Sequence, residues 1–315
     1  MNHKALEIGV IGPGAVGLTI GGLLRAAGHR VTFYAPRSAD APDALVLENV
    51  RGERTAVTGC SWSTADHWNP ATELAFLCVR GDQLAAALAV PDRRVPRDVP
   101  LAVAAATLDP VTPLARAAGW RGPILRLGVG FGAWRREDGI HRWFPMLPMG
   151  SGVAHEGDGS ARPARRIVAR ALATAGLTAR PAPWPLYRWL MLTSFAVQTA
   201  QCLGFARAGW SLETLAKDSD LVARTAAAMK QAARAIGPEG GPLGLAAALA
   251  PTSLYRRMLR ALPRRVSADA KEVWRHHGPK IWSQVRFLTN QLLARATRRG
   301  IRTDALVALA VSDGQ

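Results

Sequence analysis

The chain has few cysteines, and those it has are widely separated. Its three cysteines, Cys60, Cys78 and Cys202, form neither a C-x-x-C pair nor a closely spaced pair with a histidine. A disulfide framework needs an even set of cysteines, and a zinc site needs closely spaced Cys or His ligands. The sequence therefore predicts buried free thiols and no metal site.

Long uncharged apolar runs are also missing. No run of about eighteen apolar residues without charge occurs, and no charged, apolar and small-residue signal segment precedes the first apolar run. We therefore expect a cytoplasmic protein that neither spans a membrane nor is secreted. The chain has 315 residues, of which 49% are apolar, which is enough for two domains with separate cores.

A glycine-rich turn near the N-terminus is the most informative feature that is present. Residues 7–37 read EIGVIGPGAVGLTIGGLLRAAGHRVTFYAPR, a pattern that predicts a strand, a turn, a helix and a second strand. Gly12, Gly14 and Gly17 have the spacing G-x-G-x-x-G. In a dinucleotide-binding unit the first glycine allows the tight turn, the second admits the pyrophosphate, and the third lets the helix pack closely on the sheet.

The predicted helix begins at Ala15 and Val16, where free N–H groups and the positive end of the helix dipole would face the phosphates. A structural βαβ unit without ligand is the alternative interpretation. The apolar face formed by Leu18, Ile20 and Leu24 places the glycines in the expected strand–turn–helix context.

The end of the second predicted strand indicates which dinucleotide would bind. An acidic residue there suits the ribose of NAD, whereas an arginine suits the additional phosphate of NADP. Phe33 to Pro36 contain no acidic residue, and Arg37 and Ser38 follow. The sequence therefore favours NADP, although Arg37 can also be read as one more solvated arginine.

Acidic residues are scarce beside basic ones. The chain has 23 Asp and Glu against 40 Lys and Arg, a formal net charge of +17. Because no zinc knuckle, basic-aromatic motif or lysine-rich tail accompanies this charge, we expect no nucleic-acid partner. Basic residues concentrate between Arg256 and Arg302. A solvated helix face explains them most simply, and an anionic substrate, an acidic carrier protein and the cofactor phosphates remain alternatives.

Strands alternate with helices through the first half of the chain, which is typical of a doubly wound, mostly parallel sheet. Further segments are predicted as a polar hairpin at 44–61, strands at 74–80 and 101–107, a helix from about 83, an antiparallel ribbon within 123–154 and a helix at 161–175. The proline-rich stretch Thr178–Pro185 marks the best domain boundary. We predict a Rossmann-type α/β domain over residues 1–180.

The character of the sequence changes after that boundary. Helical periodicity dominates at 186–205, 211–236, 243–262 and 271–299. The prediction for residues 181–315 is an all-helical domain.

This combination resembles the ketopantoate reductase family over nearly the whole chain. The resemblance rests on GPGAVG, GHRVTFYAPR, LAFLCVR followed by GDQLAAAL, the helix beginning RWLML, and the closing LLARATRRGI. It implies that NADPH binds in the first domain and that a small keto acid binds in the cleft between domains. Hydride attack on the keto carbon then leaves an alkoxide that must be protonated.

The residues that the family uses for this chemistry are largely replaced. The lysine that supplies the proton aligns with Met191, which cannot donate one. Two polar substrate contacts align with Phe195 and Thr199. The resemblance therefore assigns Met191, Phe195 and Thr199 to the substrate site while removing its usual acid.

Three further family positions are altered as well. The glutamate that usually holds a substrate hydroxyl becomes Gln284, and the asparagine after the fourth strand falls on Ala106 or Thr107. Arg80 replaces a lysine and keeps the positive charge. Loss of the lysine, the glutamate and the asparagine together indicates a different reaction or substrate.

The stretch KEVWRHHGPKIWSQ offers substitutes for the missing acid. Glu272, His276 and Lys280 are four residues apart, on one face if a single helix continues, although Pro279 interrupts that register. Histidine titrates in the useful range, so Glu272, His276 and Gln284 are the catalytic candidates. A solvated basic helix is the simpler interpretation.

Tryptophan is common, and several tryptophans lie in or beside segments that line the cleft in this family. They are Trp184, Trp189, Trp274 and Trp282. Core packing explains most tryptophans, but together with Met191 and Phe195 they favour a large apolar pocket, and Trp282 is the candidate wall residue.

The leading hypothesis is therefore an NADPH-dependent reductase acting on a substrate other than ketopantoate. A cyclase or isomerase, or a catalytically silent cofactor-binding protein, is the alternative. The expected partner is a small-molecule substrate, with no nucleic acid and no membrane, and a homodimer remains open.

Overall fold

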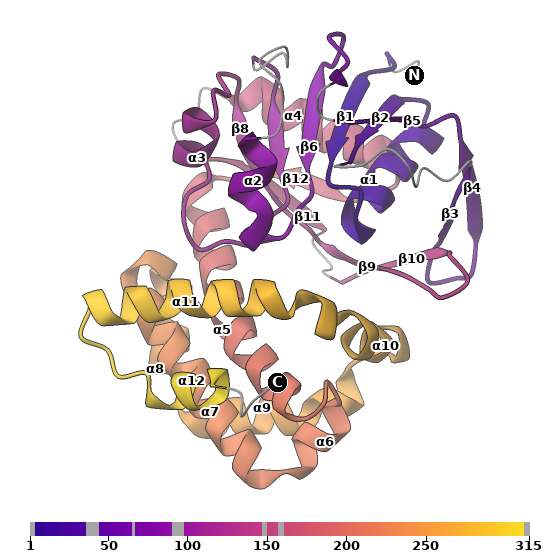
Figure 1. Ribbon diagram of the computed structural model, residues 1–315. Helices are drawn as coiled ribbons and strands as arrows, with labels where there is room; N and C mark the ends of the chain where they lie inside the picture. The colour runs from indigo at the N-terminus through magenta and orange to yellow at the C-terminus, as the bar shows by residue number, and fades with distance from the viewer. Residues whose placement is uncertain are drawn as a thin grey trace. The chain divides into compact units, whose positions relative to one another are not determined.

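The computed structural model describes residues 4–35, 44–64, 67–89, 98–146, 150–156 and 161–311, apart from the side chains of residues 269, 270, 273 and 277. The chain forms two compact units (Figure 1). The first comprises Met1–Ala105 and Pro110–Trp184, and the second comprises Ala106–Asp109 and Pro185–Gln315. The chain enters the second unit for the last time between Trp184 and Pro185, whereas the sequence predicts a boundary between residues 180 and 181.

An eight-stranded sheet forms the centre of the first unit, in the order β12-β11-β8-β7-β6-β1-β2-β5. Its strands are β1 (Glu7–Ile11), β2 (Arg30–Tyr34), β5 (Ser61–Ser63), β6 (Leu74–Leu77), β7 (Leu101–Val103), β8 (Ile124–Gly128), β11 (Ser151–His155) and β12 (Ala179–Pro181). Neighbouring strands are parallel except β8 and β11, which are antiparallel. The predicted fold class, a Rossmann-type α/β domain followed by helices, is confirmed.

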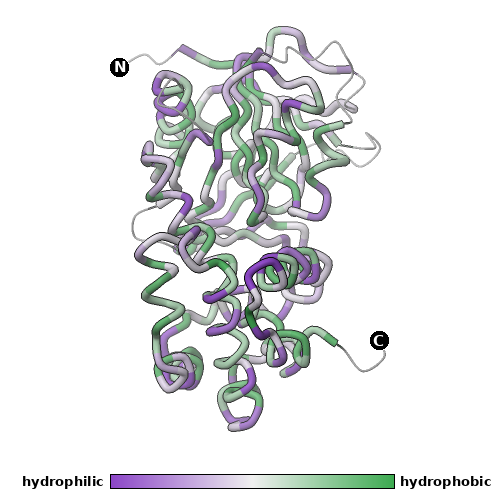
Figure 2. Tube along the Cα trace, turned by 90° about the vertical axis from the view of Figure 1, so that its left-hand side faces the viewer, coloured by the Kyte–Doolittle hydropathy of each residue, from purple (hydrophilic) through white to green (hydrophobic). Residues whose placement is uncertain are grey.

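Helices cover both faces of this sheet because its central strands are apolar on both sides. All four residues of β6 are buried, and the strands in the middle of the first unit are hydrophobic in Figure 2. One apolar cluster joins the sheet to α1 (Ala15–Ala26) and α4 (Arg162–Thr174). Another joins it to α2 (Leu84–Ala89) and α3 (Thr112–Ala117).

A second, four-stranded sheet packs against α1, in the order β4-β3-β10-β9. Its strands are β3 (Ala44–Glu48), β4 (Arg54–Thr58), β9 (Phe131–Arg135) and β10 (His141–Pro145). The predicted hairpin forms, and the strands within 123–154 divide between the two sheets. β8 and β11 form an antiparallel pair in the main sheet, whereas β9 and β10 form an antiparallel ribbon in this second sheet. Gly22 of α1 permits the packing, since a Cβ there would lie 2.6 Å from Leu45 Cδ2 and 2.9 Å from Leu47 Cδ1.

Strand β7 is shorter than the predicted strand at 101–107. It ends at Val103, and the contacts of residues 106–109 assign them to the second unit. The chain thus passes between the units at 105/106, at 109/110 and at 184/185.

The second unit is helical, as predicted. Its elements are α5 (Trp184–Arg207), α6 (Leu212–Lys217), α7 (Ser219–Ile236), η4 (Gly237–Gly240), α8 (Gly241–Leu249), α9 (Thr252–Arg265), α10 (Ala268–His277), η5 (Pro279–Ile281), α11 (Trp282–Arg298) and α12 (Asp304–Ala310). Their buried faces form one apolar cluster that includes Leu203, Phe205, Val222 and Leu292. No helix in the described part of the chain is long and apolar enough to cross a membrane.

Three of the predicted helices are broken in the structure. The helix expected over 243–262 divides into α8 and α9 at Ala250 and Pro251. The helix expected over 211–236 is interrupted at Asp218, whose carboxylate accepts a hydrogen bond from Leu221 N and starts α7. The helix expected over 271–299 divides into α10 and α11 around Gly278 and Pro279. Proline cannot donate the backbone hydrogen bond that a continuous helix requires.

Candidate dinucleotide-binding site

The glycine turn lies where β1 ends and α1 begins. Gly12 has φ +85°, and a Cβ at this position would lie 2.6 Å from Cys78 O and from Val79 Cγ1. At Gly17, a Cβ would lie 2.3 Å from Gly12 O. Any larger residue at either position would displace backbone, so the turn holds its compact shape only with glycine.

Gly14 differs from its two neighbours, because its surroundings are open. Its backbone is extended (φ −79°, ψ −173°), and a Cβ there would meet no described atom within 4 Å. Gly14 is the N-cap of α1 but makes no side-chain cap, and the first turn carries no acidic residue. The N–H groups of Ala15 and Val16 therefore start a helix whose positive end remains available to an anion.

The neighbouring strands place further groups at this edge of the sheet. Gly12 N donates to Tyr34 O at 3.2 Å and Cys78 N donates to Ile11 O at 2.8 Å, which connects the turn to β2 and β6. Burial raises the pKa of the Cys78 thiol to about 12, so this thiol stays protonated and uncharged. Strand β6 and Cys78, which follows it, therefore bring no charge to the glycine turn.

Arg80 follows β6 and carries the nearest predicted positive charge. Its guanidinium makes two hydrogen bonds to the Asp82 carboxylate, at 3.1 and 3.2 Å, and its side chain is 38% exposed. At the end of β2, Tyr34 and Ala35 offer no carboxylate. Arg37 and Ser38, which the sequence assigns to the 2′-phosphate, lie outside the described residues.

The residues predicted for substrate binding lie on α5 of the second unit. Met191, Phe195 and Thr199 are four residues apart and form one row, with Met191 and Phe195 half-buried. Thr199 is 2% exposed and its hydroxyl donates to Phe195 O at 2.6 Å. This hydroxyl is bonded within its own helix, and Phe195 packs against the apolar cluster of the second unit.

The catalytic candidates belong to two different elements. Glu272 and His276 lie one turn apart on α10, and His276 is exposed. Because α10 ends at His277, Lys280 does not continue their row. Gln284 lies in the first turn of α11, with its side chain half-buried.

Trp282 belongs to an aromatic cluster inside the second unit. Its ring meets Trp210 edge-on at 6.4 Å, and Trp274 meets Phe205 at 5.1 Å. Gly278 closes the cluster, since a Cβ there would lie 2.2 Å from the Trp210 ring. Both rings thus have packing partners within the second unit, and Trp282 stays a predicted wall residue of the substrate pocket.

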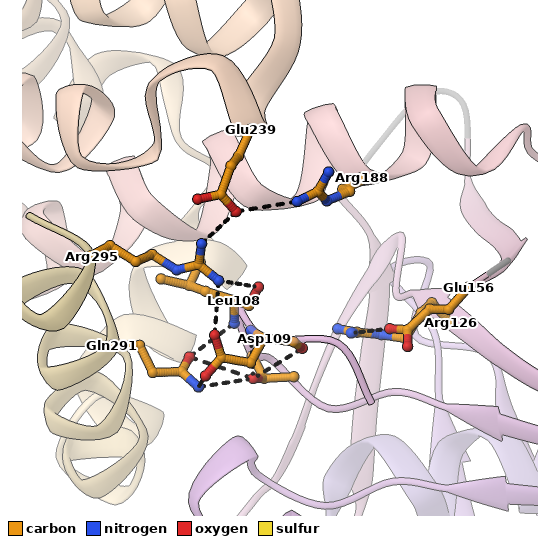
Figure 3. A network of polar contacts seen from close by, with 9 residues as sticks. Leu108, Asp109, Arg126, Glu156, Arg188, Glu239, Gln291 and Arg295 are labelled. Carbon is orange, nitrogen blue, oxygen red and sulfur yellow. Dashed lines mark hydrogen bonds and ion pairs between the residues drawn. The ribbon is translucent and has the colours of Figure 1, made fainter. Parts of the chain in front are cut away.

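A polar network that the sequence did not reveal holds the segment between β7 and α3 (Figure 3). Gln291 of α11 accepts from Leu108 N at 2.9 Å and donates to Asp109 Oδ2 at 2.6 Å. Arg295, one turn later, donates to Leu108 O at 3.0 Å and to Asp109 Oδ1 at 2.8 Å. Thus both the backbone and the carboxylate of this segment are bound by α11.

Arg295 also pairs with Glu239, which accepts from Arg188 of α5 at 3.2 Å. In the first unit, buried Arg126 donates to Ala105 O at 3.2 Å and pairs with Glu156 at 2.8 Å, and Glu156 accepts from Val111 N at 2.8 Å. The residues on either side of the segment are therefore fixed too. Gln291 and Arg295 show only a four-residue spacing in the sequence, and nothing there identifies partners more than 180 residues away.

A cavity of about 460 Å³ occurs elsewhere in the first unit. Its walls include Phe131, Trp143, Ser151 and Thr178, and it does not include the glycine turn. In the part of the chain that the structure describes, no group of three or more His, Cys, Asp or Glu side chains could hold a metal ion.

Comparisons with known proteins agree with this geometry. Residues 8–144 match the sequence model of the family described as ketopantoate reductase PanE/ApbA. The match includes the glycine turn, β6, β7 and the second sheet. No curated protein matches the chain.

Solved structures match over nearly the whole length. A PanE/ApbA family ketopantoate reductase from Ralstonia eutropha JMP134 has a TM-score of 0.73 at 17% identity, covering 97% of this chain and 96% of that one. A 2-dehydropantoate 2-reductase from Geobacter metallireducens GS-15 has a TM-score of 0.69 at 15% identity, with 97% and 98% covered. The chain has the fold of these reductases. D-mandelate dehydrogenase, in a complex with NADH and anilino(oxo)acetate, has a TM-score of 0.72 at 14% identity, with 97% and 96% covered.

Proposed function

We propose that the protein is an NADPH-dependent reductase of the ketopantoate reductase type, whose substrate is larger and more apolar than ketopantoate. The observation that carries this proposal is the geometry of the glycine turn. Neighbouring backbone leaves no room for a side chain at Gly12 or Gly17, whereas the space beside Gly14 is open. A pyrophosphate needs this combination of a compact turn, close backbone access and a helix N-terminus.

The residues around the turn fit a nicotinamide dinucleotide. Gly12, Gly14, Ala15, Val16 and Gly17 would hold the pyrophosphate. When bound, the cofactor would supply a hydride to a carbonyl carbon. The chain's own residues must then position the substrate and provide the proton.

The preference for NADPH over NADH rests on the end of β2. Because Tyr34 and Ala35 offer no carboxylate to a ribose 2′-hydroxyl, Arg37 and Ser38 would bind a 2′-phosphate, with Arg80 as a second positive charge. Arg37→Ala should weaken NADPH at least tenfold and leave NADH within about threefold, as one charge-assisted contact predicts. Arg51→Ala is the control, since Arg51 is another exposed arginine of the first unit. Equal effects on both cofactors would refute the assignment.

The proposed substrate class rests on α5. Met191 and Phe195 stand where the family has a lysine and an asparagine, and neither can hold a small polar keto acid. Glu272 and His276 remain the candidates for proton transfer, and Gln284 remains the candidate for polarising the substrate oxygen. His276→Gln should abolish the alkaline limb of the pH–rate profile if His276 is the acid, because the acid must be protonated to act, whereas a purely structural role would leave the profile's shape unchanged.

The deciding experiment measures binding and turnover separately. NADPH binding to the full chain is followed by quenching of tryptophan fluorescence, and NADPH oxidation is followed with small keto acids and with aryl and alkyl ketones. The reductase proposal expects binding and turnover, with the bulky ketones favoured. Binding without turnover over the whole panel would favour an isomerase, a cyclase or a silent cofactor-binding protein, a possibility that Met191 supports because it cannot donate a proton.

A homodimer in the cytoplasm is the assembly that we infer. A ketopantoate reductase from Staphylococcus aureus, whose structure matches with a TM-score of 0.67 at 10% identity, is dimeric. Light scattering of the purified chain would test the assembly.

A further inference from the structure

Helix α9 carries five arginines and no acidic residue. The arginines are Arg256, Arg257, Arg260, Arg264 and Arg265, and all of them are exposed. Within the described part of the chain none of the five forms an ion pair, and Arg260 has only a hydrogen bond to Ser219 Oγ at 3.3 Å. The positive charge of this helix is therefore not neutralised by its surroundings.

The acidic residues of the neighbouring elements are already engaged or lie outside hydrogen-bond reach. Glu213 of α6, which packs against α9, is paired with Lys271 at 2.8 Å. Asp218 caps α7 by accepting from Leu221 N at 2.8 Å. Asp220 in the first turn of α7 makes no ion pair with a described arginine of α9. Five like charges on one helix repel one another, so the arrangement costs stability in the free protein.

Two of the arginines lie on the outermost side of α9. Its inner face is fixed by Tyr255 and Leu259, which are 4% and 1% exposed. With about 3.6 residues per turn, the positions opposite these two are those of Arg257 and Arg264. Arg256, Arg260 and Arg264 are four residues apart and form a continuous row, which runs from one flank of the helix to this outer side.

Aliphatic residues flank the arginines on one side. Leu254 and Met258 of α9 are 46% and 48% exposed. We call the arginine row together with these two aliphatic side chains the α9 surface.

We propose that the α9 surface is a docking site for an acidic protein. Its binding face would be a helix with carboxylates spaced to meet Arg256, Arg260 and Arg264 and with apolar residues to cover Leu254 and Met258. Such a partner removes both unfavourable features at once, because it neutralises the repelling charges and buries the exposed aliphatic groups.

Two other occupants fit the surface less well. A second copy of the chain would bring the same five arginines to a twofold contact, where they would repel. A helix that lies in a membrane surface carries its apolar residues at the outermost position, with basic residues beside them. Here that order is reversed, because Arg257 and Arg264 project furthest.

The test uses the full chain and a synthetic helical peptide with glutamates four residues apart and leucines on the adjoining row, with binding followed by fluorescence anisotropy. The variant Arg256→Glu/Arg260→Glu/Arg264→Glu should weaken binding by about 100-fold, as expected for the loss of three paired charges. The matched control is Arg162→Glu/Arg166→Glu/Arg170→Glu on α4, which changes three exposed arginines at the same spacing and alters the net charge equally. This control should change peptide affinity by less than about threefold if the contact is local and not a long-range field effect.

A second variant tests the apolar part of the surface. Leu254→Ser/Met258→Ser keeps every charge and should weaken the peptide by about tenfold, since it removes two exposed contacts from the buried centre of the interface. Unchanged thermal unfolding and far-UV circular dichroism show that each variant is folded.

Three results would overturn the proposal. The first is an equal loss of affinity in the α4 control, which would show that any basic face suffices. The second is tighter binding of the chain to vesicles of phosphatidylglycerol than to the peptide, lost in the α9 variant. The third is tighter binding of the chain to single-stranded RNA than to the peptide, again lost in the α9 variant. All arms are independent of the proposed reaction, so failure of one proposal does not affect the other.

Discussion

At the scale of single residues, the glycine turn shows that three glycines can be required for three different reasons. Gly12 needs a positive φ and close contact with Cys78 O, Gly17 needs close helix packing, and Gly14 needs neither. A side chain at Gly14 would meet only open space. Packing within the fold therefore does not require glycine at this position.

Replacing Gly12 and Gly14 should separate stability from binding. Gly12→Ala should lower the free energy of unfolding by about 1–3 kcal/mol, because it puts strain into a left-handed position and a Cβ against backbone. Gly14→Ala should leave thermal unfolding unchanged and weaken NADPH at least tenfold. Urea unfolding and fluorescence titration measure the two effects. If Gly14→Ala bound NADPH normally, the pyrophosphate would have to lie elsewhere.

His141 should make the first unit sensitive to mild acid. It is 5% exposed in β10, and burial, with a smaller effect from Arg135, lowers its pKa from 6.5 to about 4. The unfolded chain binds the proton first as the pH falls, so stability should be lost between about pH 6.5 and 4, by up to about 3 kcal/mol.

The test of this prediction compares two histidine variants. His141→Phe should flatten the decline in the unfolding free energy between pH 7 and 4.5, because it removes the group that the unfolded chain protonates. His67→Phe changes an exposed histidine of the same unit and should leave the decline intact. An unaltered slope in His141→Phe would assign the acid sensitivity to other groups.

At the scale of secondary-structure elements, α11 holds the segment between β7 and α3 through two side chains on one face. Arg295 is 7% exposed and has three oxygen partners, from Leu108, Asp109 and Glu239. Its removal would leave the Leu108 carbonyl without this donor and would take one of two donors from each carboxylate, since Asp109 keeps Gln291 and Glu239 keeps Arg188. The attachment of residues 108 and 109 to α11 thus depends on the buried charge of Arg295.

Arg295→Met should therefore destabilise the second unit. We expect a loss of about 1–3 kcal/mol in the free energy of unfolding, less than for a fully buried pair because Asp109 is 53% and Glu239 35% exposed. Arg298→Met is the control, since Arg298 lies on the same helix and is exposed. Equal losses in both variants would show that the network contributes nothing specific.

The sequence predicted those elements whose signals are local. The strand–turn–helix of Gly12 to Gly17, the helical second unit and the hairpin at residues 44–58 all follow from short-range patterns. The early end of β7 does not, because it depends on Gln291 and Arg295, which are distant in the chain. The break at Asp218 had a local signal, a capping carboxylate, which periodicity alone overlooked, whereas Pro279 already indicated an interruption of the register near Gly278.

The same distinction applies to the candidate site. The glycine positions are readable because backbone geometry demands them, whereas a substrate site depends on side chains from separate helices. Thr199 illustrates this limit, since its hydroxyl is used by Phe195 O and only the structure reveals it.

At the scale of the whole molecule, the excess of basic residues determines how the protein attracts charged ligands. A net charge of +17 and a sequence pI of about 11.3 give a positive field that attracts anions at neutral pH. NADPH is an anion, so its encounter with the protein should be accelerated at low ionic strength.

Salt should therefore slow the association of NADPH more than its dissociation. Raising ionic strength from about 0.01 to 0.15 M should lower the association rate constant by roughly tenfold, while the dissociation rate constant changes by less than about threefold. Stopped-flow tryptophan fluorescence measures both. A dissociation rate that rises as steeply as association falls would indicate that salt acts on the bound contacts and not on long-range attraction.

The three chain passages between the units also bear on how such a protein can change during evolution. Recombination at residue 185 would give the first unit a foreign set of helices, but Leu108, which is 4% exposed, would still need residues equivalent to Gln291 and Arg295. Such an exchange would thus expose the Leu108 side chain and leave the backbone N–H and C=O of Leu108 without their hydrogen-bond partners. Residues 106–109 and helix α11 must therefore be inherited together, although about 180 residues separate them in the chain.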